Sequence, residues 1–312
     1  MDELTKLVKK WKQVNFSRVY NFEGMFSSYE DYTGHLEGRK ARLGIATLDD
    51  ALGLIRPSQV VTFGGDTNVG KTALAMNTVF SNAVNFKYGL IILIECEIDQ
   101  NEIFERAVQM EYDLYTYEVE NAFKEKNTEQ FKSIISKYKN VISLIYRINA
   151  DEIIPYIKAI EELYNKPCRL IGIDYVGLMK NRHLDEYQKI TYSMQKLKEV
   201  ALVTQAPIIN FSQVPRSDTK NKKELLGLHS GKGSGEIENS SQIYITLDLI
   251  TDEGIATMLG VSDKLMGDKP THRLIKATIH KKKQGDYGNT YLLFNKKNLR
   301  FTDLSQKEDL IF

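Results

Sequence analysis

The sequence predicts an α/β fold in which helices cover a mostly parallel sheet. Two observations support this class. From about residue 43 onward, short apolar runs rich in β-branched residues alternate with helical stretches, which is typical of repeated strand–helix–strand units. In addition, the first of these runs, residues 59–63, leads through a glycine-containing loop into a helical stretch that begins at Lys71.

The expected elements follow this alternation along the chain. We expect strands at residues 59–63, 90–94, 141–146, 170–174 and 207–211. We expect helices at residues 71–85, 102–109, 152–164 and 187–203. Residues 227–235, rich in glycine and serine, predict a loop, and residues 274–280 and 291–294 flank a glycine-rich turn and predict a C-terminal β-hairpin.

The N-terminal segment differs from the rest of the chain. Residues 6–14 predict a short basic helix that contains Trp11, whereas residues 16–36 are rich in Phe, Tyr, Ser and Gly without sustained periodicity. A segment this short cannot build a hydrophobic core alone. We therefore expect an N-terminal arm or linker at residues 1–43 and a single domain at residues 44–312.

Composition excludes several classes of protein. Hydrophobic residues make up 42% and charged residues 27% of the 312 residues, which excludes wholesale disorder. The longest strongly apolar run, residues 90–94, is far shorter than a bilayer-spanning helix, and the N-terminus lacks the apolar region of a secretory signal. Cys96 and Cys168 form no CxxC pair and predict reduced core residues. We expect a cytoplasmic protein with no membrane partner.

The charge balance alone does not identify a partner. The 42 Lys and Arg residues nearly equal the 41 Asp and Glu residues, so the chain lacks the overall basic charge of many nucleic-acid-binding proteins. Local basic clusters occur at residues 6–12, 216–232 and 276–283. Such a cluster points to a function only if the fold places it beside a functional loop.

The most specific motif is a phosphate-binding loop, which matches the pattern GxxxxGK[ST] in full. It consists of Gly65, Asp66, Thr67, Asn68, Val69, Gly70, Lys71 and Thr72. In such a loop the backbone N–H groups surround phosphate oxygens at the start of a helix. We expect Lys71 to reach the β- and γ-phosphates and Thr72 to ligate Mg²⁺. The sequence therefore predicts ATP or GTP binding.

Polar side chains follow three other expected strands. Asp174 ends one strand, where an aspartate can hold Mg²⁺ directly or through water. Glu95 and Glu97 follow residues 90–94 and face the nucleotide crevice, where a carboxylate can orient the attacking water. Strand alternation would put both glutamates on one face, so their spacing does not choose between them. Gln213 follows residues 207–211 and can sense the γ-phosphate.

These motifs, in this order, resemble the RecA-like ATPase domain of DnaB-family replicative helicases, from about residue 43 to the end of the chain. The resemblance is carried by residues 44–50, 65–72, 97–102 with Arg106, 173–179, 210–213 and 234–238, and by the final hairpin. Asp174-Tyr175 followed by Leu178-Met179, together with Ser212-Gln213, separates this family from generic phosphate-loop proteins. The resemblance implies a RecA-like P-loop NTPase core with a short N-terminal helical arm.

The resemblance also implies roles for the residues of the site. In that family the catalytic glutamate stands nine residues before an arginine at the nucleotide, as Glu97 stands before Arg106, so Glu97 is expected to activate water. Gln213 is expected to couple the phosphate state to the grip on DNA. The implied machine is a homo-hexameric ring that hydrolyses Mg-ATP, translocates on single-stranded DNA and unwinds duplex during replication, with a primase or helicase loader as partner.

The resemblance places DNA contacts in the two loops that follow Met179 and Gln213. The expected contacts are Lys180, Arg182, Arg216, Lys232, Gly233 and Gly235. Contacts from such loops to the phosphate backbone are independent of sequence and sensitive to salt.

This chain departs from the family pattern in the hairpin that acts across the subunit interface. The family's hairpin lysine and its arginine finger appear here as Lys281 and Lys283, which are expected to meet the γ-phosphate held by the next protomer. A lysine is a point charge without the bidentate fork of an arginine, so slower hydrolysis is expected.

The N-terminal segment is a second departure. Family members carry an N-terminal helical domain that stabilises the ring and docks primase, and residues 1–43 are too few to form one, which suggests a member from a phage or other mobile element. In the family, a helix before the ATPase domain packs on the neighbouring subunit. We therefore expect the helix around residues 4–14 to dock on an adjacent protomer; the alternative is that it folds back on its own domain.

Two other interpretations remain open from the sequence. The chain could be a RecA-fold ATPase that acts in recombination or as a regulator without unwinding. It could also be a binding module that keeps ATP as a structural ligand, an interpretation that the lysine in place of the arginine finger supports.

Overall fold

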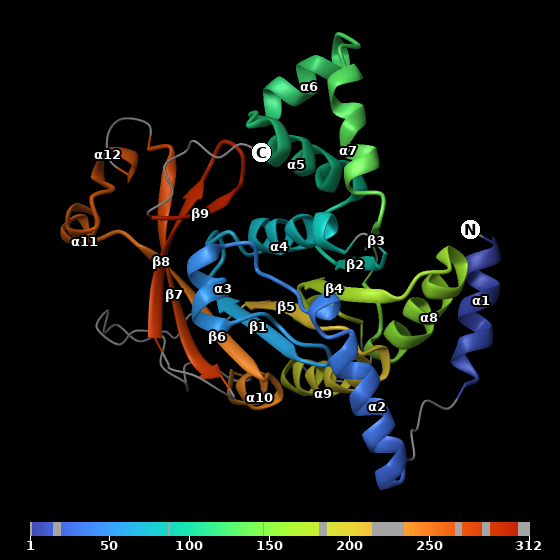
Figure 1. The fold of residues 1–312 in the computed structure, drawn as a ribbon. Coiled ribbons are helices and arrows are strands. Elements are labelled where there is room, and N and C mark those ends of the chain that lie inside the picture. Colours follow the sequence, from blue (N-terminus) through green and yellow to red (C-terminus); the bar gives the residue numbers. More distant parts are fainter. Residues whose placement is uncertain are drawn as a thin grey trace.

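The computed structural model describes residues 2–14, 20–86, 88–145, 147–180, 186–213, 234–265, 270–282 and 288–304. Within these residues the chain forms a nine-stranded sheet with helices on both faces (Figure 1). The strands are β1 (Val60–Gly65), β2 (Leu90–Glu95), β3 (Val141–Ile145), β4 (Cys168–Asp174), β5 (Ile208–Gln213), β6 (Ile243–Ile250), β7 (His272–Lys282), β8 (Gly288–Asn295) and β9 (Phe301–Asp303). The helices are α1 (Asp2–Lys12), α2 (Phe22–Gly34), α3 (Ala46–Leu52), α4 (Lys71–Asn85), α5 (Gln100–Tyr112), α6 (Thr116–Lys124), α7 (Lys132–Lys137), α8 (Ile153–Tyr164), α9 (Glu186–Thr204), α10 (Ser234–Ser240), α11 (Glu253–Met258) and α12 (Ser262–Leu265).

The sheet has a parallel half and an antiparallel half. Its strand order is β3-β2-β4-β5-β1-β6-β7-β8-β9; neighbouring strands from β3 to β6 pair parallel, whereas β7, β8 and β9 pair antiparallel. Strands β1 and β2 are buried along their whole length, as expected for strands covered on both faces. The predicted α/β class, the mostly parallel sheet and the C-terminal β-hairpin are confirmed.

Alternate side chains of the parallel strands enter two separate cores. Phe63 and Leu93 pack on the face covered by α4, whereas Ile92 and Ile171 pack on the face covered by α8 and α9. In the described part of the chain, no helix is long and apolar enough to cross a membrane. Because both faces are covered, the polar groups of the candidate site lie at the strand ends.

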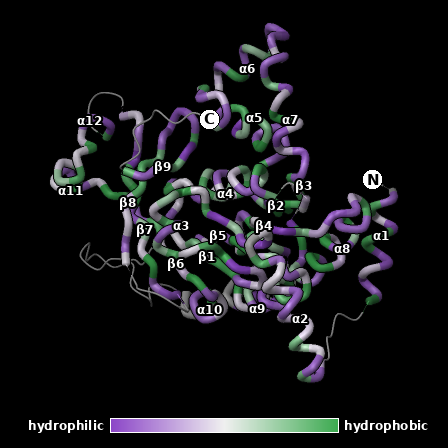
Figure 2. Tube along the Cα trace, viewed as in Figure 1, coloured by the Kyte–Doolittle hydropathy of each residue, from purple (hydrophilic) through white to green (hydrophobic). Residues whose placement is uncertain are grey.

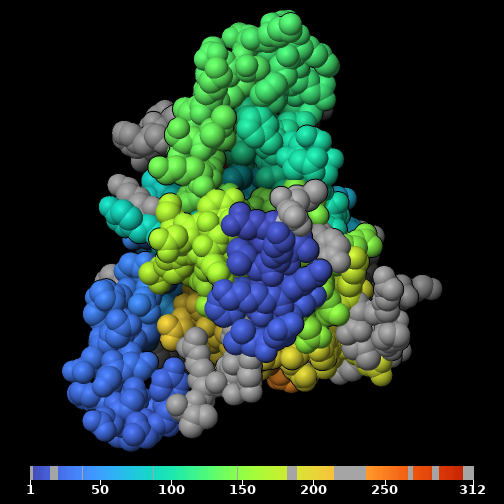
Figure 3. All heavy atoms as spheres, turned by 90° about the vertical axis from the view of Figure 1, so that its right-hand side faces the viewer, coloured from blue at the N-terminus to red at the C-terminus, as the bar shows by residue number. Residues whose placement is uncertain are grey.

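Helix α1 lies along α8 of its own domain (Figures 1 and 3). The Nζ of Lys10 and the Nε1 of Trp11 donate to Glu162 at 2.8 and 2.7 Å, and Lys12 pairs with Glu152 at 2.6 Å. The side chain of Val8 is buried against the domain. A helix was expected here, but in this chain it folds back on its own domain, the alternative to docking on an adjacent protomer.

Helix α2 lies in the aromatic segment before residue 40, for which the sequence predicted no particular helix. It begins after Asn21, whose side chain accepts from the Gly24 N–H at 2.7 Å as an N-cap. None of its residues is buried, and it projects from the domain (Figures 1 and 3). Only Gly24 and Tyr32 of the helix are half-buried, so the segment presents no core-facing stripe.

Helices α5, α6 and α7 form a second projection between β2 and β3 (Figure 1). Only residues 102–109 were expected to be helical in this region. A small separate core of Val108, Val119, Phe131 and Ile134 holds the three helices together. Figure 2 shows hydrophobic and hydrophilic stretches interspersed along α5, α6 and α7.

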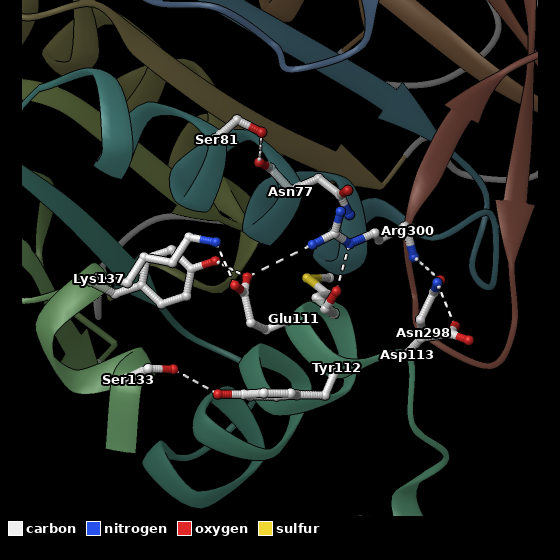
Figure 4. Close-up of polar contacts among 11 residues, drawn as sticks. Asn77, Ser81, Glu111, Tyr112, Asp113, Ser133, Lys137, Asn298 and Arg300 are labelled. Carbon is white, nitrogen blue, oxygen red and sulfur yellow. Dashed lines mark hydrogen bonds and ion pairs between the residues drawn. The ribbon is translucent and has the colours of Figure 1, made fainter. Parts of the chain in front are cut away.

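A polar network joins this projection to the turn between β8 and β9 (Figure 4). Glu111 accepts from Tyr138 Oη at 2.8 Å, pairs with Lys137, and lies 3.8 Å from Arg300 Nη2. Asp113 accepts from Lys297 Nζ at 2.9 Å and from Asn298 Nδ2 at 2.8 Å. The antiparallel half of the sheet is therefore tied to the helix that follows β2.

Candidate nucleotide-binding site

The phosphate loop connects β1 to α4 and contains two residues in the left-handed region. Asn68 has φ +68° and Gly70 has φ +88°. A Cβ on Gly70 would lie 2.9 Å from Cζ of Phe301, so the position requires glycine both for its backbone angle and for its space. The helix that begins at Lys71 then presents free N–H groups at the loop.

Lys71 lies inside the loop and is only 8% exposed. Its Nζ donates to the carbonyl oxygens of Gly65 at 3.0 Å and Asp66 at 2.7 Å. Burial lowers the pKa of Lys71, while the charges of Asp174, Glu97 and Asp66 act in the opposite direction. The ammonium is thus held beside three carboxylates at the mouth of the loop.

Two carboxyl groups stand side by side at the carboxyl edge of the sheet. Glu95 and Asp174 are register partners on β2 and β4, and both are almost completely buried. Burial raises the pKa of Glu95 to about 8, with a further contribution from Asp174. Burial also raises the pKa of Asp174 to about 6, although a hydrogen bond from Thr72 and the charges of Lys71 and Arg106 oppose it.

This pair fits a divalent cation. Within the described residues neither oxygen of Asp174 has a hydrogen-bond partner of good geometry, although the Thr72 hydroxyl lies close enough to affect its pKa. The Oε2 atom of Glu95 is also buried without a partner among these residues. Unsatisfied buried carboxylate oxygens beside a hydroxyl are the oxygen ligands that Mg²⁺ prefers.

The structure separates the two glutamates that the sequence left on one face. Strand β2 ends at Glu95, and its Oε1 accepts the backbone N–H groups of Glu97 at 2.9 Å and Ile98 at 3.3 Å. The chain bends there, so Glu97 is exposed whereas Glu95 is buried. Burial therefore distinguishes the two glutamates, which strand alternation did not, although the charge of Glu97 still acts on Glu95 and Lys71.

Gln213 and Arg106 reach the same edge from two further elements. Gln213 ends β5 and is the register partner of Gly65, the first residue of the loop. Arg106 lies on α5 and pairs with Glu102, and its charge acts on the pKa of Asp174. The structure thus brings together the loop, Asp174, Glu95, Glu97, Gln213 and Arg106.

Lys281 lies away from the loop of its own chain. The register runs from Gly65 to Leu247 and on to Ala277, so Lys281 stands four residues further toward the opposite edge, about 13 Å along the strand. Its Nζ donates to the carbonyl oxygens of Glu238 at 2.8 Å and Asn239 at 3.3 Å in α10. Lys283 lies outside the described residues.

Two of the expected DNA contacts lie in the described ranges. Gly235 is in the first turn of α10. Lys180 is exposed, and its backbone N–H donates to the Ile148 carbonyl oxygen at 3.0 Å. The remaining expected contacts, Arg182, Arg216, Lys232 and Gly233, lie outside the described residues.

Sequence reasoning missed the residues that contact the loop from the antiparallel half. Arg273 Nη1 donates to the Asn68 carbonyl oxygen at 2.6 Å, and the Phe294 and Phe301 rings lie against Gly70. No motif marks these residues, because only the register of β7, β8 and β9 places them at the loop.

Comparisons with known proteins agree with this geometry. The family model for the DnaB-like helicase C-terminal domain matches residues 41–303. A solved structure described as an ATPase domain superposes with a TM-score of 0.69 at 17% identity, covering 92% of this chain and 99% of that one. No curated protein matches the chain.

Two further solved structures share the fold. A DnaB-like replicative helicase, described with its interactions with primase, gives a TM-score of 0.64 at 17% identity over 92% of this chain and 67% of that one. A KaiC-like protein from the hyperthermophilic archaeon Pyrococcus horikoshii OT3 gives a TM-score of 0.54 at 17% identity over 85% of this chain and 98% of that one. At such identities these similarities describe the fold.

A parallel sheet with a phosphate loop after β1 and carboxylates at the neighbouring strand ends defines a RecA-like P-loop NTPase. The extent of the family match then gives the family. The chain belongs to the DnaB-like helicase C-terminal domain family, which implies the use of a nucleotide and a divalent metal ion by an NTP-driven helicase.

Proposed function

We propose that this protein is an ATP-dependent DNA helicase motor of the DnaB type, which assembles as a hexamer, translocates on single-stranded DNA and unwinds duplex during replication. The observation that carries the proposal is the phosphate loop with the buried Asp174 beside it, in a chain whose family match spans residues 41–303. The family match supports DNA as the substrate, and the phosphate loop with Asp174 supports ATP hydrolysis as the source of energy.

In this proposal Lys71 binds the β- and γ-phosphates of ATP, exchanging the carbonyl oxygens of Gly65 and Asp66 for phosphate oxygens. Thr72 and Asp174 would hold Mg²⁺. The bound ion would neutralise charge on the β- and γ-phosphates during transfer to water. Arg106 adds a positive charge on the same side of the site, as its effect on the pKa of Asp174 indicates.

Glu97 is the residue that orients the attacking water in this scheme. It is exposed at the mouth of the site, and its charge acts on Lys71 and Asp174. Glu95 instead supports the turn that carries Glu97, through its contacts to the backbone N–H groups of residues 97 and 98. Gln213, next to the first residue of the loop, reports the γ-phosphate to the segment that follows β5.

We further propose that Lys281 and Lys283 serve the site of an adjacent protomer. Strand β7 runs away from the loop of its own chain, so residues beyond Ala277 approach the opposite edge. A cation supplied in trans in this way stabilises charge in the transition state and contributes roughly a thousandfold or more in related enzymes. In this proposal the hydrogen bond from Lys281 to α10 is present in the isolated chain and is replaced in the ring by a bond to the phosphate of the adjacent site.

The ring itself would use α2. This helix has no buried residue, and Phe22, Phe26 and Tyr29 are large exposed side chains on it. We propose that α2, rather than α1, lies on the neighbouring protomer, since α1 already covers α8 of its own domain. A primase or helicase loader remains a proposed partner.

Single-stranded DNA would be held by Lys180, Arg182, Arg216, Lys232, Gly233 and Gly235. Gln213 ends β5 beside the first residue of the phosphate loop and Gly235 lies in the first turn of α10, so the sequence between them links the phosphate loop to α10. Each lost phosphate contact from this set should reduce the log–log salt slope of binding by roughly 0.7.

The deciding experiment measures three quantities on one preparation: ATPase rate with and without single-stranded DNA, strand displacement on a forked duplex, and mass with nucleotide present. We expect DNA-stimulated hydrolysis, displacement and a hexamer mass. Hydrolysis without displacement would instead support a RecA-fold ATPase in recombination or regulation. ATP binding without turnover would support a binding module.

The shared site has its own test. Lys283→Ala protomers should bind ATP but hydrolyse it poorly, and Lys71→Ala protomers should also be inactive. A mixture should recover part of the turnover, because some interfaces then combine an intact loop with an intact Lys283. No recovery in rings shown by mass to be mixed would contradict a site built from two protomers.

A further inference from the structure

The tip of the phosphate loop is held from outside by an arginine of the antiparallel half. Arg273 stands near the start of β7 and pairs across the ladder with Phe294. Its Nη1 donates to the Asn68 carbonyl oxygen at 2.6 Å, and its guanidinium carbon lies 6.0 Å from the centroid of the Phe294 ring. The hydrogen bond to Asn68 and the adjacent Phe294 ring together fix the orientation of the guanidinium group.

This contact determines the direction of an N–H group inside the loop. In a planar trans peptide the carbonyl and the N–H of the next residue point in opposite directions. Because the Asn68 carbonyl oxygen points toward Arg273, the N–H of Val69 in the same peptide points away from Arg273. The N–H groups of such a loop are the donors that surround phosphate oxygens.

The peptide between Asn68 and Val69 needs such an anchor. Asn68, on one side of this peptide, has φ +68°, a region that a residue other than glycine adopts rarely, and Gly70, one residue beyond Val69, has φ +88°. Lys71 anchors the loop from inside, but its bonds end on Gly65 and Asp66 at the start of the loop. The only hydrogen bond from a side chain to the Asn68 backbone in the described ranges comes from Arg273.

We propose that Arg273 is a positioning residue for nucleotide binding, which holds the Val69 N–H toward the β-phosphate by fixing the Asn68 carbonyl. The inference rests on the proposed function, since it assumes that the loop binds a nucleoside di- or triphosphate. Both ADP and ATP carry a β-phosphate, so loss of the Arg273 side chain lowers the affinity of the protein for the two nucleotides to a similar extent. The chemical step, which uses Glu97 and the γ-phosphate, changes little once the site is saturated.

Arg300 provides a matched control. Its Nε donates to the Met110 carbonyl oxygen at 2.6 Å, the same kind of bond at the same distance, but to α5 rather than to the phosphate loop. Arg273→Met and Arg300→Met each remove an arginine–carbonyl bond from the antiparallel half. Arg273→Lys keeps a cation that can reach a carbonyl and serves as the conservative variant.

The experiment measures the dissociation constant of a fluorescent ADP analogue, the KM and kcat for ATP, and the unfolding midpoint of all four proteins. For Arg273→Met we expect roughly tenfold weaker ADP binding and a roughly tenfold higher KM for ATP, because a hydrogen bond from a charged donor is lost. The kcat should stay within about threefold of that of the unaltered protein. Arg273→Lys should recover part of the affinity. Arg300→Met should leave ADP affinity unchanged.

Several outcomes overturn the inference. Arg273→Met that binds ADP as tightly as Arg300→Met does would show that the contact does not orient the loop. A drop in kcat with unchanged KM would place Arg273 in the chemical step instead. If Arg273→Met is poorly folded, hydrogen exchange of the Val69 amide with and without ADP is measured instead in Arg273→Gln, whose shorter and neutral side chain also loses the charged contact to the Asn68 carbonyl oxygen. Protection equal to that of the unaltered protein would contradict the proposal. Absence of ADP binding by the unaltered protein would overturn the proposed function as well.

Discussion

The phosphate loop, Asp174, Glu97 and Gln213 all lie at the ends of parallel strands, whereas Arg273, Phe294 and Phe301 reach the same loop from the antiparallel half. The parallel half supplies the atoms that would touch the nucleotide. The antiparallel half supplies contacts that hold the backbone between those atoms. The two halves therefore have different sequence signatures, because a ligand contact requires a residue type at a spacing, whereas a supporting contact requires only a suitable partner in the fold.

The largest expected effect concerns the parallel half. Glu97→Gln should reduce ATP turnover by roughly 10²–10⁴-fold, because an amide cannot accept the proton of the attacking water, while nucleotide binding persists. The measurement is steady-state ATPase beside a binding isotherm for the same variant.

Glu95→Gln is the matched control. The amide keeps an oxygen that can accept from the backbone N–H groups of Glu97 and Ile98, so the turn that carries Glu97 should persist. Turnover should stay within a few-fold of the unaltered protein. Stalled turnover in Glu95→Gln with normal turnover in Glu97→Gln would reverse the assignment.

The sequence was informative for the parallel half because its signals are local. The loop is a contiguous motif, and Asp174 and Gln213 end apolar runs long enough to be recognised as strands. The bend after Glu95 was not predictable from alternation, since it depends on a side chain bonding to the backbone two residues later. The family spacing between Glu97 and Arg106, rather than periodicity, carried that assignment.

The antiparallel half and the two projections were less predictable for a physical reason. Arg273 and Asn68 are 205 residues apart, and their contact exists only after β7 has paired with β6 and β6 with β1. Helix α2 has no buried face and so no apolar periodicity to detect. Both features are consequences of tertiary placement.

The second prediction tests whether the antiparallel half supports the loop. Phe301 is buried against Phe294, with ring centroids 4.9 Å apart, and against Gly70. Phe301→Ala should lower the free energy of unfolding by about 3–5 kcal/mol, measured by urea titration, because it leaves a cavity beside the loop. Tyr88→Ala, at a side chain that is 88% exposed just before β2, should change it by less than about 0.5 kcal/mol in the same assay.

A loss for Phe301→Ala no larger than that for Tyr88→Ala would mean that β9 is a peripheral strand. In that case the comparison between a binding half and a supporting half would fail.

The third prediction uses the opposite pH responses of the two halves. On the parallel half, burial raises the pKa of Glu95 to about 8 and of Asp174 to about 6. The folded state then binds more protons than the unfolded state between about pH 4 and 8, so this pair makes stability fall as the pH rises through that range. On the antiparallel half, burial and Lys276 lower the pKa of His280, so its contribution is lost as the pH falls below its usual value near 6.5.

The check is the free energy of unfolding at pH 5 and pH 8, in chelator. Glu95→Gln should flatten the decline with rising pH, because the group that titrates is gone. His280→Gln, which keeps a group able to bond Thr246 Oγ1, should instead steepen that decline, since it removes a contribution of opposite sign. Mg²⁺ should also flatten the curve of the unaltered protein, because it favours the charged carboxylates. Equal slopes in all variants would contradict the assignment of both groups.

The smallest expected effect concerns the link between the antiparallel half and the α5–α7 projection. Lys297 Nζ lies 2.9 Å from Asp113 Oδ2, with side chains 30% and 49% exposed, and the hydrogen bond to Asp113 raises the pKa of Lys297. An exposed pair of this kind contributes about 0.2–1 kcal/mol and is screened by salt. Lys297→Met should therefore lower the free energy of unfolding by an amount in that range at low salt, and by a smaller amount at about 1 M salt. Lys296→Met, which removes a bond to the Pro270 carbonyl oxygen outside the projection, is the comparison variant. Nucleotide affinity should be unchanged in both variants, because the pair lies at the end of α5 rather than at the loop.

A Lys297→Met variant that folds normally but binds ADP several-fold more weakly would show that the projection affects the site through α5. The supporting role would then extend beyond the antiparallel strands.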